Sequence, residues 1–448
     1  MGRLFGTDGI RGIANSFLSC ELAVKVGRAA GTVLSDGSRR RLLFCVGSDT
    51  RISSDMLSFS IASGLCSVGV DVIILGVVPT PAVAYLVEKY KADAGIMISA
   101  SHNPAEYNGI KIFSGDGYKI PDALEEQIET LVLDEEIPEN LSGTDIGKVT
   151  YANNAVRDYV EHLKSTVMNS LDGLNIAVDC ANGSASVSAE MLFKELGANA
   201  DILHNKPNGI NINRNCGSTH MEELKGRVLV EKANVGLAFD GDADRMLAVD
   251  ENGKLIDGDQ IMSIIGNFMK EQGTLKKDMI VVTVMSNLGM TLMAQERGIT
   301  LEQTKVGDRY VLERMQEIGA NLGGEQSGHI IMLDRNTTGD GLLSALLLLE
   351  VLVKTGKPLS ELASIMDVLP QALVNAKVPN HKKDRYMEYP EIATAIAKLT
   401  EQFAGEGRVL IRPSGTEPLV RVMIEGEDMK IIKQRATYLA KLIEARLG

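Results

Sequence analysis

The chain contains 448 residues, of which 44% are hydrophobic, 23% charged and 4% aromatic, and its formal net charge is −13. This length predicts several domains with cores of their own. The acidic balance and the lack of tryptophan argue against a surface for nucleic acid or anionic membranes, so we expect neither partner. Five scattered cysteines without a CxxC pair, and a start without the apolar run of a signal peptide, predict a cytoplasmic protein with no disulfide framework and no zinc site.

The N-terminal motif FGTDGIRG, residues 5–12, is the first candidate for ligand binding. Its glycines allow the backbone to approach a ligand closely, and Arg11 offers a guanidinium that suits a phosphate. An ordinary turn with a solvated arginine is the alternative. A helix is predicted from about residue 21 to residue 34, where alanine, valine and leucine recur at helical spacing.

A pattern of strand, polar turn, helix and strand occurs three times, in residues 41–76, 174–205 and 278–304. Three copies of about 30 residues each predict three related α/β domains with mixed or parallel sheets. In such sheets ligands bind at the carboxyl ends of the strands, where the polar turns lie.

After Pro370 the order changes to strand, helix, two strands and a final helix, which predicts a smaller α+β domain. An acidic stretch broken by proline, residues 133–147, predicts a linker. The apolar stretch from Leu342 to Val353 is too short to span a bilayer and is interrupted by Glu350, so we expect a buried helix there. We therefore expect four domains, at residues 1–147, 148–254, 255–369 and 370–448.

The most informative stretch is GIMISASHNPAEYNGIKIF, residues 95–113. Its apolar start predicts a buried strand that ends at a stiff turn, because small polar residues and a proline follow. The Asn-Gly pair at 108–109 predicts a second turn. An exposed Ser101 at a strand end, with Lys111 close by, suits a nucleophile or a carrier of phosphate. An ordinary strand-end turn is the alternative.

The stretch GLAFDGDADRMLAVD, residues 236–250, places Asp240, Asp242 and Asp244 at alternate positions. In an extended chain these carboxylates would point to one side, and their repulsion predicts a divalent cation. The spacing is similar to that of an EF-hand loop. However, Arg245 stands where that loop needs glycine, and the predicted flanks are strands, so an oxygen-ligated Mg²⁺ site is favoured. A solvated acidic hairpin is the alternative.

The stretch NLGGEQSGHI, residues 321–330, is a glycine-bracketed loop dense in hydrogen-bonding groups. Glu325, Ser327 and His329 suit a polyhydroxy ligand, and a satisfied turn with a structural histidine is the alternative.

The stretch IRPSGTEPLVR, residues 411–421, contains the groups of a phosphate cradle: a guanidinium, two hydroxyls and close backbone N–H groups. These come from Arg412, Ser414, Gly415 and Thr416. A plain Pro-Gly turn between two strands is the alternative.

The motifs SASHNP, DGDADR, GEQSGH and RPSGTEP follow one another along the chain, which in this respect resembles the α-D-phosphohexomutases. FGTDGIRG, NINRNCGSTH (residues 211–220) and Gln326 are similar to the bacterial members that act on glucosamine phosphates. The resemblance implies interconversion of glucosamine 6-phosphate and glucosamine 1-phosphate, toward UDP-N-acetylglucosamine and peptidoglycan. Phosphomannomutase or phosphoglucomutase activity is the alternative, which only the sugar loop and residues 304–310 would discriminate.

By position, the resemblance implies that Ser101 is a phosphoserine and that it binds Mg²⁺ together with Asp240, Asp242 and Asp244. It further implies the following contacts: sugar hydroxyls at Glu325 and Ser327, and the non-reacting phosphate at Arg412, Ser414, Gly415 and Thr416. Positive charge beside the phosphoserine would come from Lys111, Arg11 and Arg245, and the proton acceptor or donor would be Lys111, Arg11 or His329.

The same resemblance implies a small sugar phosphate as the substrate and a sugar 1,6-bisphosphate as the primer, and it leaves a homodimer open. Two other classes remain as alternatives. One is a metal-dependent phosphatase, in which water attacks the phosphoserine and inorganic phosphate is released. The other is a non-catalytic sugar-phosphate sensor, which would have no need to keep both the serine and the three aspartates.

Overall fold

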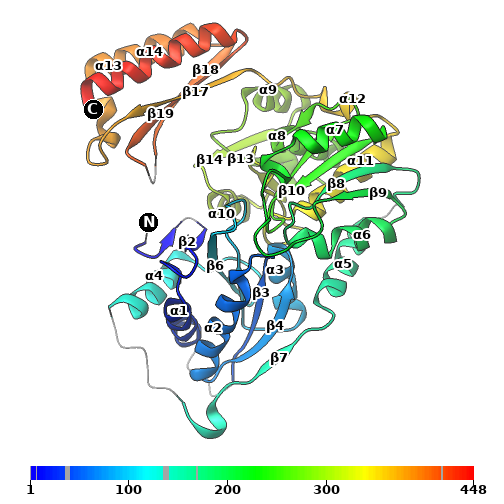
Figure 1. Cartoon of the computed structure of the whole chain (residues 1–448). Helices are drawn as coiled ribbons and strands as arrows, with labels where there is room; N and C mark the ends of the chain where they lie inside the picture. The colour runs from blue at the N-terminus through cyan, green and yellow to red at the C-terminus, as the bar shows by residue number, and fades with distance from the viewer. Residues whose placement is uncertain (1, 7, 36–40, 135–140, 168–169, 415–416) are drawn as a thin grey trace. The chain divides into compact units, whose positions relative to one another are not determined.

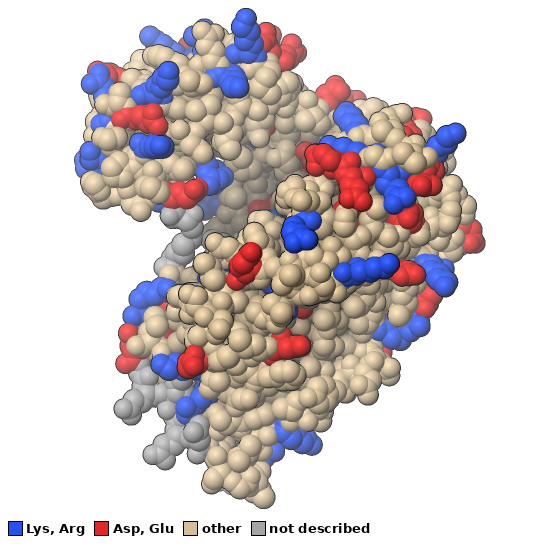
Figure 2. Space-filling model, in the orientation of Figure 1, with Lys and Arg blue, Asp and Glu red and all other residues tan. Residues whose placement is uncertain are grey.

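The protein is represented by a computed structural model, which describes residues 2–6, 8–35, 41–134, 141–167, 170–414 and 417–448. It divides into two compact units, one made of Met1–Met285 and Gly298–Ile365, the other of Ser286–Arg297 and Met366–Gly448. Acidic and basic side chains are interspersed on the face drawn in Figure 2. Among the helices of the described residues, none combines the length and the apolar character needed to cross a membrane.

The first unit begins with a mixed sheet whose described strands follow the order β1-β2-β6-β5-β3-β4-β7 (Figure 1). The strands are β1 (Phe5–Gly6), β2 (Gly9–Ile13), β3 (Leu43–Ser48), β4 (Asp71–Val77), β5 (Ala94–Ile98), β6 (Tyr107–Ser114) and β7 (Val149–Tyr151). The helices are α1 (Cys20–Val33), α2 (Ser53–Ser67), α3 (Thr80–Lys89) and α4 (Asp122–Leu133). Apolar residues of α1, α2 and α4 form one core with β3, β4, β5 and β6. On the opposite face α3 packs close to the sheet at Gly47 and Gly95, where a Cβ atom would meet Val83.

The predicted order of strand, turn, helix and strand in residues 41–76 is confirmed by β3, α2 and β4. The turn predicted at Asn108 and Gly109 is wrong, because both residues lie inside β6. Gly109 fits there because the backbone of neighbouring strands approaches it closely, and a Cβ atom at this position would collide with Ser99 O. The Asn-Gly pair is therefore a site of close strand packing and not a hairpin turn.

The second sheet follows the order β12-β11-β10-β8-β9 in the described part of the chain. Its strands are β8 (Asn175–Asp179), β9 (Asn199–Leu203), β10 (Val235–Phe239), β11 (Met246–Asp250) and β12 (Leu255–Ile256), and its helices are α5 (Ala155–Ser165), α6 (Ala189–Glu195) and α7 (Glu222–Glu231). β10 is parallel to β8 and antiparallel to β11. The predicted order of elements in residues 174–205 is confirmed.

The third sheet has the described order β14-β13-β15-β16. Its strands are β13 (Met279–Thr283), β14 (Thr300–Thr304), β15 (Leu322–Gly324) and β16 (Ile330–Met332), and its helices are α8 (Gly258–Glu271), α10 (Asp308–Ile318), α11 (Gly341–Thr355) and α12 (Leu359–Ala363). The apolar stretch predicted to form a buried helix is α11, in which residues 341–352 are all buried.

The second unit contains an antiparallel sheet of described order β17-β19-β18. Its elements are α9 (Leu288–Arg297), β17 (Gln371–Lys377), α13 (Pro390–Gln402), β18 (Gly407–Pro413), β19 (Leu419–Gly426) and α14 (Met429–Leu447). The fold class predicted from sequence, three related α/β domains with mixed sheets and a smaller α+β domain, is confirmed.

Candidate active site

Ser101 lies in the turn after β5, with its backbone in the left-handed region at φ 51°. Its exposed fraction is 1%, so the expectation of an exposed serine is wrong. Ser101 N donates a hydrogen bond to Ser99 Oγ at 3.0 Å, and Arg51 Nη2 donates one to Ser101 O at 2.9 Å. Non-glycine residues keep such a backbone conformation only where the surroundings impose it. The turn therefore fixes the direction of the hydroxyl.

Asp240, Asp242 and Asp244 lie in the loop between β10 and β11, and their ligand oxygens are all within 4.8 Å of one another. The loop is not extended as expected, because Ala243 has a φ of 56° and the chain turns. The predicted flanking strands are present. Ser101 Oγ donates a hydrogen bond to Asp240 Oδ2 at 2.7 Å. The serine and the three carboxylates therefore form one buried cluster at the ends of two sheets.

The electrostatics of this cluster fit a divalent cation. Burial, together with the charges of Asp244 and Asp242, raises the pKa of Asp240 well above its usual range. Asp242 Oδ1 is buried and accepts no hydrogen bond from the described residues. A buried carboxylate oxygen without a donor costs free energy, which a bound cation would offset. Carboxylate and hydroxyl oxygens are ligands of Mg²⁺ and Ca²⁺, so the three aspartates and Ser101 could hold such an ion.

Lys111, on β6, supplies a buried positive charge to the same cluster. Its Nζ atom lies 2.9 Å from Asp242 Oδ2, 3.3 Å from Asp244 Oδ2 and 3.0 Å from Asp8 Oδ2. Burial alone would lower the pKa of Lys111, but these carboxylates raise it well above its usual range. Lys111 is therefore protonated near neutral pH. The guanidinium of Arg11 pairs with Asp8, and Asp8 pairs in turn with Lys111. Arg11 is therefore linked to the cluster through Asp8.

A second group of buried and half-buried charged side chains connects the aspartate loop to the third sheet. His329 lies with Nδ1 3.7 Å from Asp244 Oδ1 and Nε2 3.6 Å from Asp308 Oδ2. Lys119 pairs with both Asp308 and Asp8. Burial would lower the pKa of His329, but the two carboxylates beside it raise that pKa overall. The imidazole is therefore stabilised in its protonated form.

Arg245 follows the aspartate loop directly, and its backbone N–H donates a hydrogen bond to Asp240 Oδ1 at 3.2 Å. Burial would lower the pKa of the guanidinium, but the charges of Asp244, Asp240 and Glu325 raise it. Glu325 lies in the hairpin between β15 and β16, where its Oε1 accepts a hydrogen bond from Gly307 N at 3.1 Å. Arg245 therefore carries positive charge between the aspartate loop and the predicted sugar loop.

The other residues of the predicted sugar loop differ in exposure. Ser327 is exposed and His329 is buried. Gln326 is half-buried, and its Nε2 donates to Asp257 Oδ2 at 3.1 Å. The side chains of Ser327 and Gln326 are therefore more accessible to solvent than the imidazole of His329.

The predicted phosphate loop belongs to the second unit. Arg412 lies at the end of β18, directly opposite Arg421 on β19. Arg412 Nε is buried and has no hydrogen-bond partner among the described residues, and burial followed by the charge of Arg421 lowers the pKa of this guanidinium. Ser414 Oγ accepts a hydrogen bond from Glu417 N at 3.2 Å. The predicted residues Gly415 and Thr416 lie outside the described residues.

Sequence reasoning missed Arg51 and Lys119 altogether, included Asp308 only within residues 304–310, and gave Asp8 no role. Asp8 could have been found, because it stands inside the glycine-rich motif beside Arg11. Lys119 and Asp308 had no such signal, since neither belongs to a motif and their contact joins two sheets.

Comparison with known protein families shows that the chain matches the models of one family. Models of the phosphoglucomutase/phosphomannomutase family match the chain as α/β/α domain I at residues 2–138, domain II at 157–253, domain III at 257–369 and the C-terminal domain at 373–442. Curated relatives named phosphoglucosamine mutase, from Ruminiclostridium cellulolyticum and Acetivibrio thermocellus, are 55% and 56% identical over 100% of both chains.

Solved structures give the same picture of the fold. A phosphoglucomutase/phosphomannomutase family protein from Burkholderia thailandensis is 25% identical, with a TM-score of 0.81 over 98% of this chain and 97% of its own. The N-acetylphosphoglucosamine mutase of Aspergillus fumigatus, solved with GlcNAc-6P and magnesium, is 18% identical, with a TM-score of 0.71 over 99% and 96% of the two chains.

Proposed function

Because the chain belongs to the phosphoglucomutase/phosphomannomutase family, we propose that it interconverts glucosamine 6-phosphate and glucosamine 1-phosphate. The observation that carries this proposal is the identity of 55–56% over the whole chain with relatives named phosphoglucosamine mutase. The product would lead toward UDP-N-acetylglucosamine and peptidoglycan. Phosphomannomutase or phosphoglucomutase activity is the second candidate, because the family models bear those names.

Ser101 is proposed as the carrier of the phosphoryl group. In the first transfer the bond between phosphorus and Ser101 Oγ breaks and a bond to the free O1 of glucosamine 6-phosphate forms, which gives a 1,6-bisphosphate. The proton of O1 passes to a base of the site. After the intermediate has turned over, the phosphoryl group on O6 returns to Ser101 Oγ and O6 regains a proton. The fixed backbone of Ser101 supports this role, since phosphoryl transfer depends mainly on positioning and charge neutralisation.

The charges of the site would balance a phosphoserine, which adds about −1.5 to −2 units beside the three aspartates. Lys111 and Arg245 carry fixed positive charge at the cluster. Arg11 pairs with Asp8, which contacts Lys111, so Arg11 adds further positive charge close by. Mg²⁺ bound by Ser101 and the aspartates would polarise the transferring phosphoryl group.

His329 is the strongest candidate for the proton donor and acceptor. Lys111 and Arg11 are tied to carboxylates, so they would have to leave ion pairs to exchange a proton. His329 lies between Asp244 and Asp308 at longer distances, and an imidazole can both donate and accept near neutral pH. Its raised pKa favours the donor form, which suits protonation of the leaving sugar oxygen.

Binding of the sugar phosphate would use the two remaining loops. Glu325 and Ser327 are proposed to hold sugar hydroxyls. Arg412 and Ser414, together with Gly415 and Thr416, are proposed to hold the phosphate that does not react. The Nε of Arg412, which has no hydrogen-bond partner among the described residues, supports an anion site: burial and the charge of Arg421 on the neighbouring strand lower the pKa of Arg412, and a bound anion would offset both effects.

Four further parts complete the proposal. A sugar 1,6-bisphosphate would prime Ser101, and the chain would divide into domains near residues 147, 254 and 369. The cytoplasm is proposed as the location because all five cysteines are free thiols. A homodimer stays a prediction that sedimentation would test.

The proposal is tested by a coupled assay with glucosamine, glucose and mannose phosphates, Mg²⁺ and a trace of glucose 1,6-bisphosphate. We expect the highest kcat/KM for glucosamine phosphate. A higher kcat/KM for glucose or mannose phosphate would favour the second candidate. Release of inorganic phosphate at the rate of substrate loss would instead indicate a phosphatase.

A further inference from the structure

The backbone of Ser101 is held from two sides. Ser101 O accepts hydrogen bonds from Arg51 Nη2 at 2.9 Å and from Asn213 Nδ2 at 2.8 Å. The same two side chains donate to Asn103 O, at 2.8 and 3.0 Å. Arg51 comes from the turn after β3 and so belongs to the sheet that carries Ser101. Asn213 comes from the segment that follows β9 in the second sheet, 112 residues away from Ser101.

Asn213 is itself firmly placed. Its side chain is buried, its backbone has a φ of 58°, and its N–H donates to Ala181 O at 2.9 Å. Asp179, at the end of β8, accepts hydrogen bonds from Ala181 N at 2.8 Å and from Gly217 N at 2.9 Å. It therefore links Ala181, which accepts the backbone hydrogen bond of Asn213, to Gly217 at the end of the segment. The amide of Asn213 is therefore presented by a braced segment rather than by a free loop.

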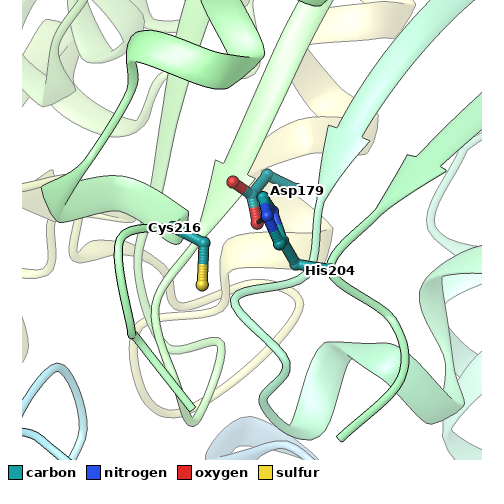
Figure 3. Close-up of side chains that lie close together, drawn as sticks. All are labelled: Asp179, His204 and Cys216. Atoms are coloured by element: carbon teal, nitrogen blue, oxygen red, sulfur yellow. Dashed lines mark ion pairs between the residues drawn. The ribbon is translucent and has the colours of Figure 1, made fainter. Parts of the chain in front are cut away.

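His204 and Cys216 lie next to Asp179 at the start and the end of this segment (Figure 3). His204 Nδ1 is 3.1 Å from Asp179 Oδ1. The three side chains lie close together, and each carboxylate oxygen of Asp179 accepts a backbone hydrogen bond that ties it to this segment. Burial followed by the charge of Asp179 raises the pKa of the Cys216 thiol to about 12, which keeps it protonated. We therefore assign these three side chains to bracing residues 204–217.

Asn213 also touches the place where the serine turn meets the aspartate loop. A Cβ atom on Gly241 would lie 2.6 Å from Ser101 O and 2.8 Å from Asn213 Nδ2, so the glycine permits a close approach of the two loops. One residue before Gly241, Asp240 accepts the hydrogen bond from the Ser101 hydroxyl. The amide of Asn213 thus lies within the contact that sets the distance between the serine and the aspartates.

We propose that Asn213 is a positioning residue for phosphoryl transfer, whose amide keeps the backbone of Ser101 in register with the aspartate loop. This inference rests on the proposed function of Ser101 as the phosphoryl carrier. The inference assigns a role to a residue of the motif NINRNCGSTH, whose third residue is Asn213. Misplacement of a reacting group by about 1 Å can cost roughly 100-fold in rate, so the effect of losing this amide would be large.

The test uses two substitutions of Asn213 and one control in the full-length protein. Asn213→Gly removes the amide and keeps a residue that accepts positive φ. Asn213→Asp keeps the shape but turns a carboxylate oxygen toward Ser101 O. The control is Asn215→Gly, because Asn215 has a φ of 57° in the same segment and its side chain is exposed.

Three readouts are needed: kcat and KM for the sugar phosphate, Tm, and the rate at which glucose 1,6-bisphosphate phosphorylates Ser101, followed by intact mass. In that reaction a phosphoryl group moves from the bisphosphate to Ser101 Oγ, and the serine proton passes to the sugar oxygen that is released. We expect both Asn213 variants to lower kcat and the phosphorylation rate by about 10- to 100-fold relative to the control, with KM little changed. Tm should fall in Asn213→Asp, where a buried carboxylate meets carbonyl oxygens, and should fall less in Asn213→Gly.

Equal kcat and phosphorylation rates in Asn213→Gly, Asn213→Asp and the control would overturn the inference. A parallel loss of Tm and a rise of KM would also overturn it, because that pattern indicates a general structural role. The proposed function fails separately, if the unsubstituted protein and the Asn215→Gly control both lack mutase activity on all three sugar phosphates. The phosphorylation rate then still reports on Asn213.

Discussion

The hydroxyl of Ser101 donates a hydrogen bond of 2.7 Å to Asp240 Oδ2, although the two residues are 139 positions apart and belong to different sheets. This contact places the predicted phosphate carrier directly against the predicted metal ligands. A phosphoryl group on Ser101 Oγ would therefore stand beside three carboxylates, and positive charge would be required to hold it there.

Substitution of Ser101 by alanine should abolish turnover and leave the fold intact. The acceptor of the phosphoryl group is lost, which costs several orders of magnitude in kcat. The free energy of unfolding should fall by no more than about 1–3 kcal/mol, because the buried Asp240 Oδ2 loses its donor while alanine and serine are similarly strained at a φ of 51°. Coupled assay and thermal unfolding check the two halves of this prediction, and activity near that of the unsubstituted protein would refute the carrier role.

Substitution of Asp242 by asparagine should weaken metal binding and activity together. Asp242 Oδ1 is buried without a hydrogen-bond donor among the described residues, so it is an oxygen that a cation would occupy. We expect the Mg²⁺ concentration for half-maximal activity to rise at least about 10-fold, since one anionic ligand is lost. Addition of a chelator should abolish the activity of the unsubstituted protein, and Mg²⁺ should restore it. Asp145→Asn, at an exposed position, is the control, and equal Mg²⁺ titrations of both variants would argue against the site.

Substitution of Lys119 by methionine should destabilise the first unit. The Lys119 side chain is 13% exposed and pairs with Asp8 and Asp308, so its removal leaves two half-buried carboxylates without this partner. Loss of one member of a half-buried ion pair costs about 1–3 kcal/mol in the free energy of unfolding, between the values for exposed and fully buried pairs. Lys276→Met removes a surface pair with Asp334 and should cost less than about 1 kcal/mol. Denaturant titrations that give the same midpoint for both variants would contradict the prediction.

Substitution of His204 by glutamine should change stability in a pH-dependent way. Contact with Asp179, opposed by burial, raises the pKa of His204 above its ordinary value of 6.5. The folded protein therefore binds this proton more tightly than the unfolded chain does. Its stabilising contribution is complete below 6.5 and is lost as the pH rises through the raised value.

The Tm difference between the unsubstituted protein and His204→Gln should therefore be larger at about pH 5.5 than at about pH 9. His220→Gln replaces an exposed histidine and serves as the control. A Tm difference that stays constant across this range would show that the pairing of His204 with Asp179 does not contribute.

Much of the fold could be predicted because it depends on local patterns. Apolar strands followed by polar turns and amphipathic helices identified β3, α2 and β4, and the same pattern identified the later repeats. The prediction failed at Asn108 and Gly109, where the pair has the composition of a turn. There the close approach of neighbouring strands outweighed the local preference, because only glycine leaves room for it.

The chemical groups of the site were also determined by the sequence. Ser101, the three aspartates and Lys111 stand in short motifs whose residue types indicate phosphate and metal chemistry. Only the tertiary structure decided which groups meet. Lys119 meets Asp308, and Asn213 meets Ser101, across more than 100 residues of chain. No local pattern marks such pairs, because each contact arises from the packing of separate sheets and not from neighbouring positions in the sequence.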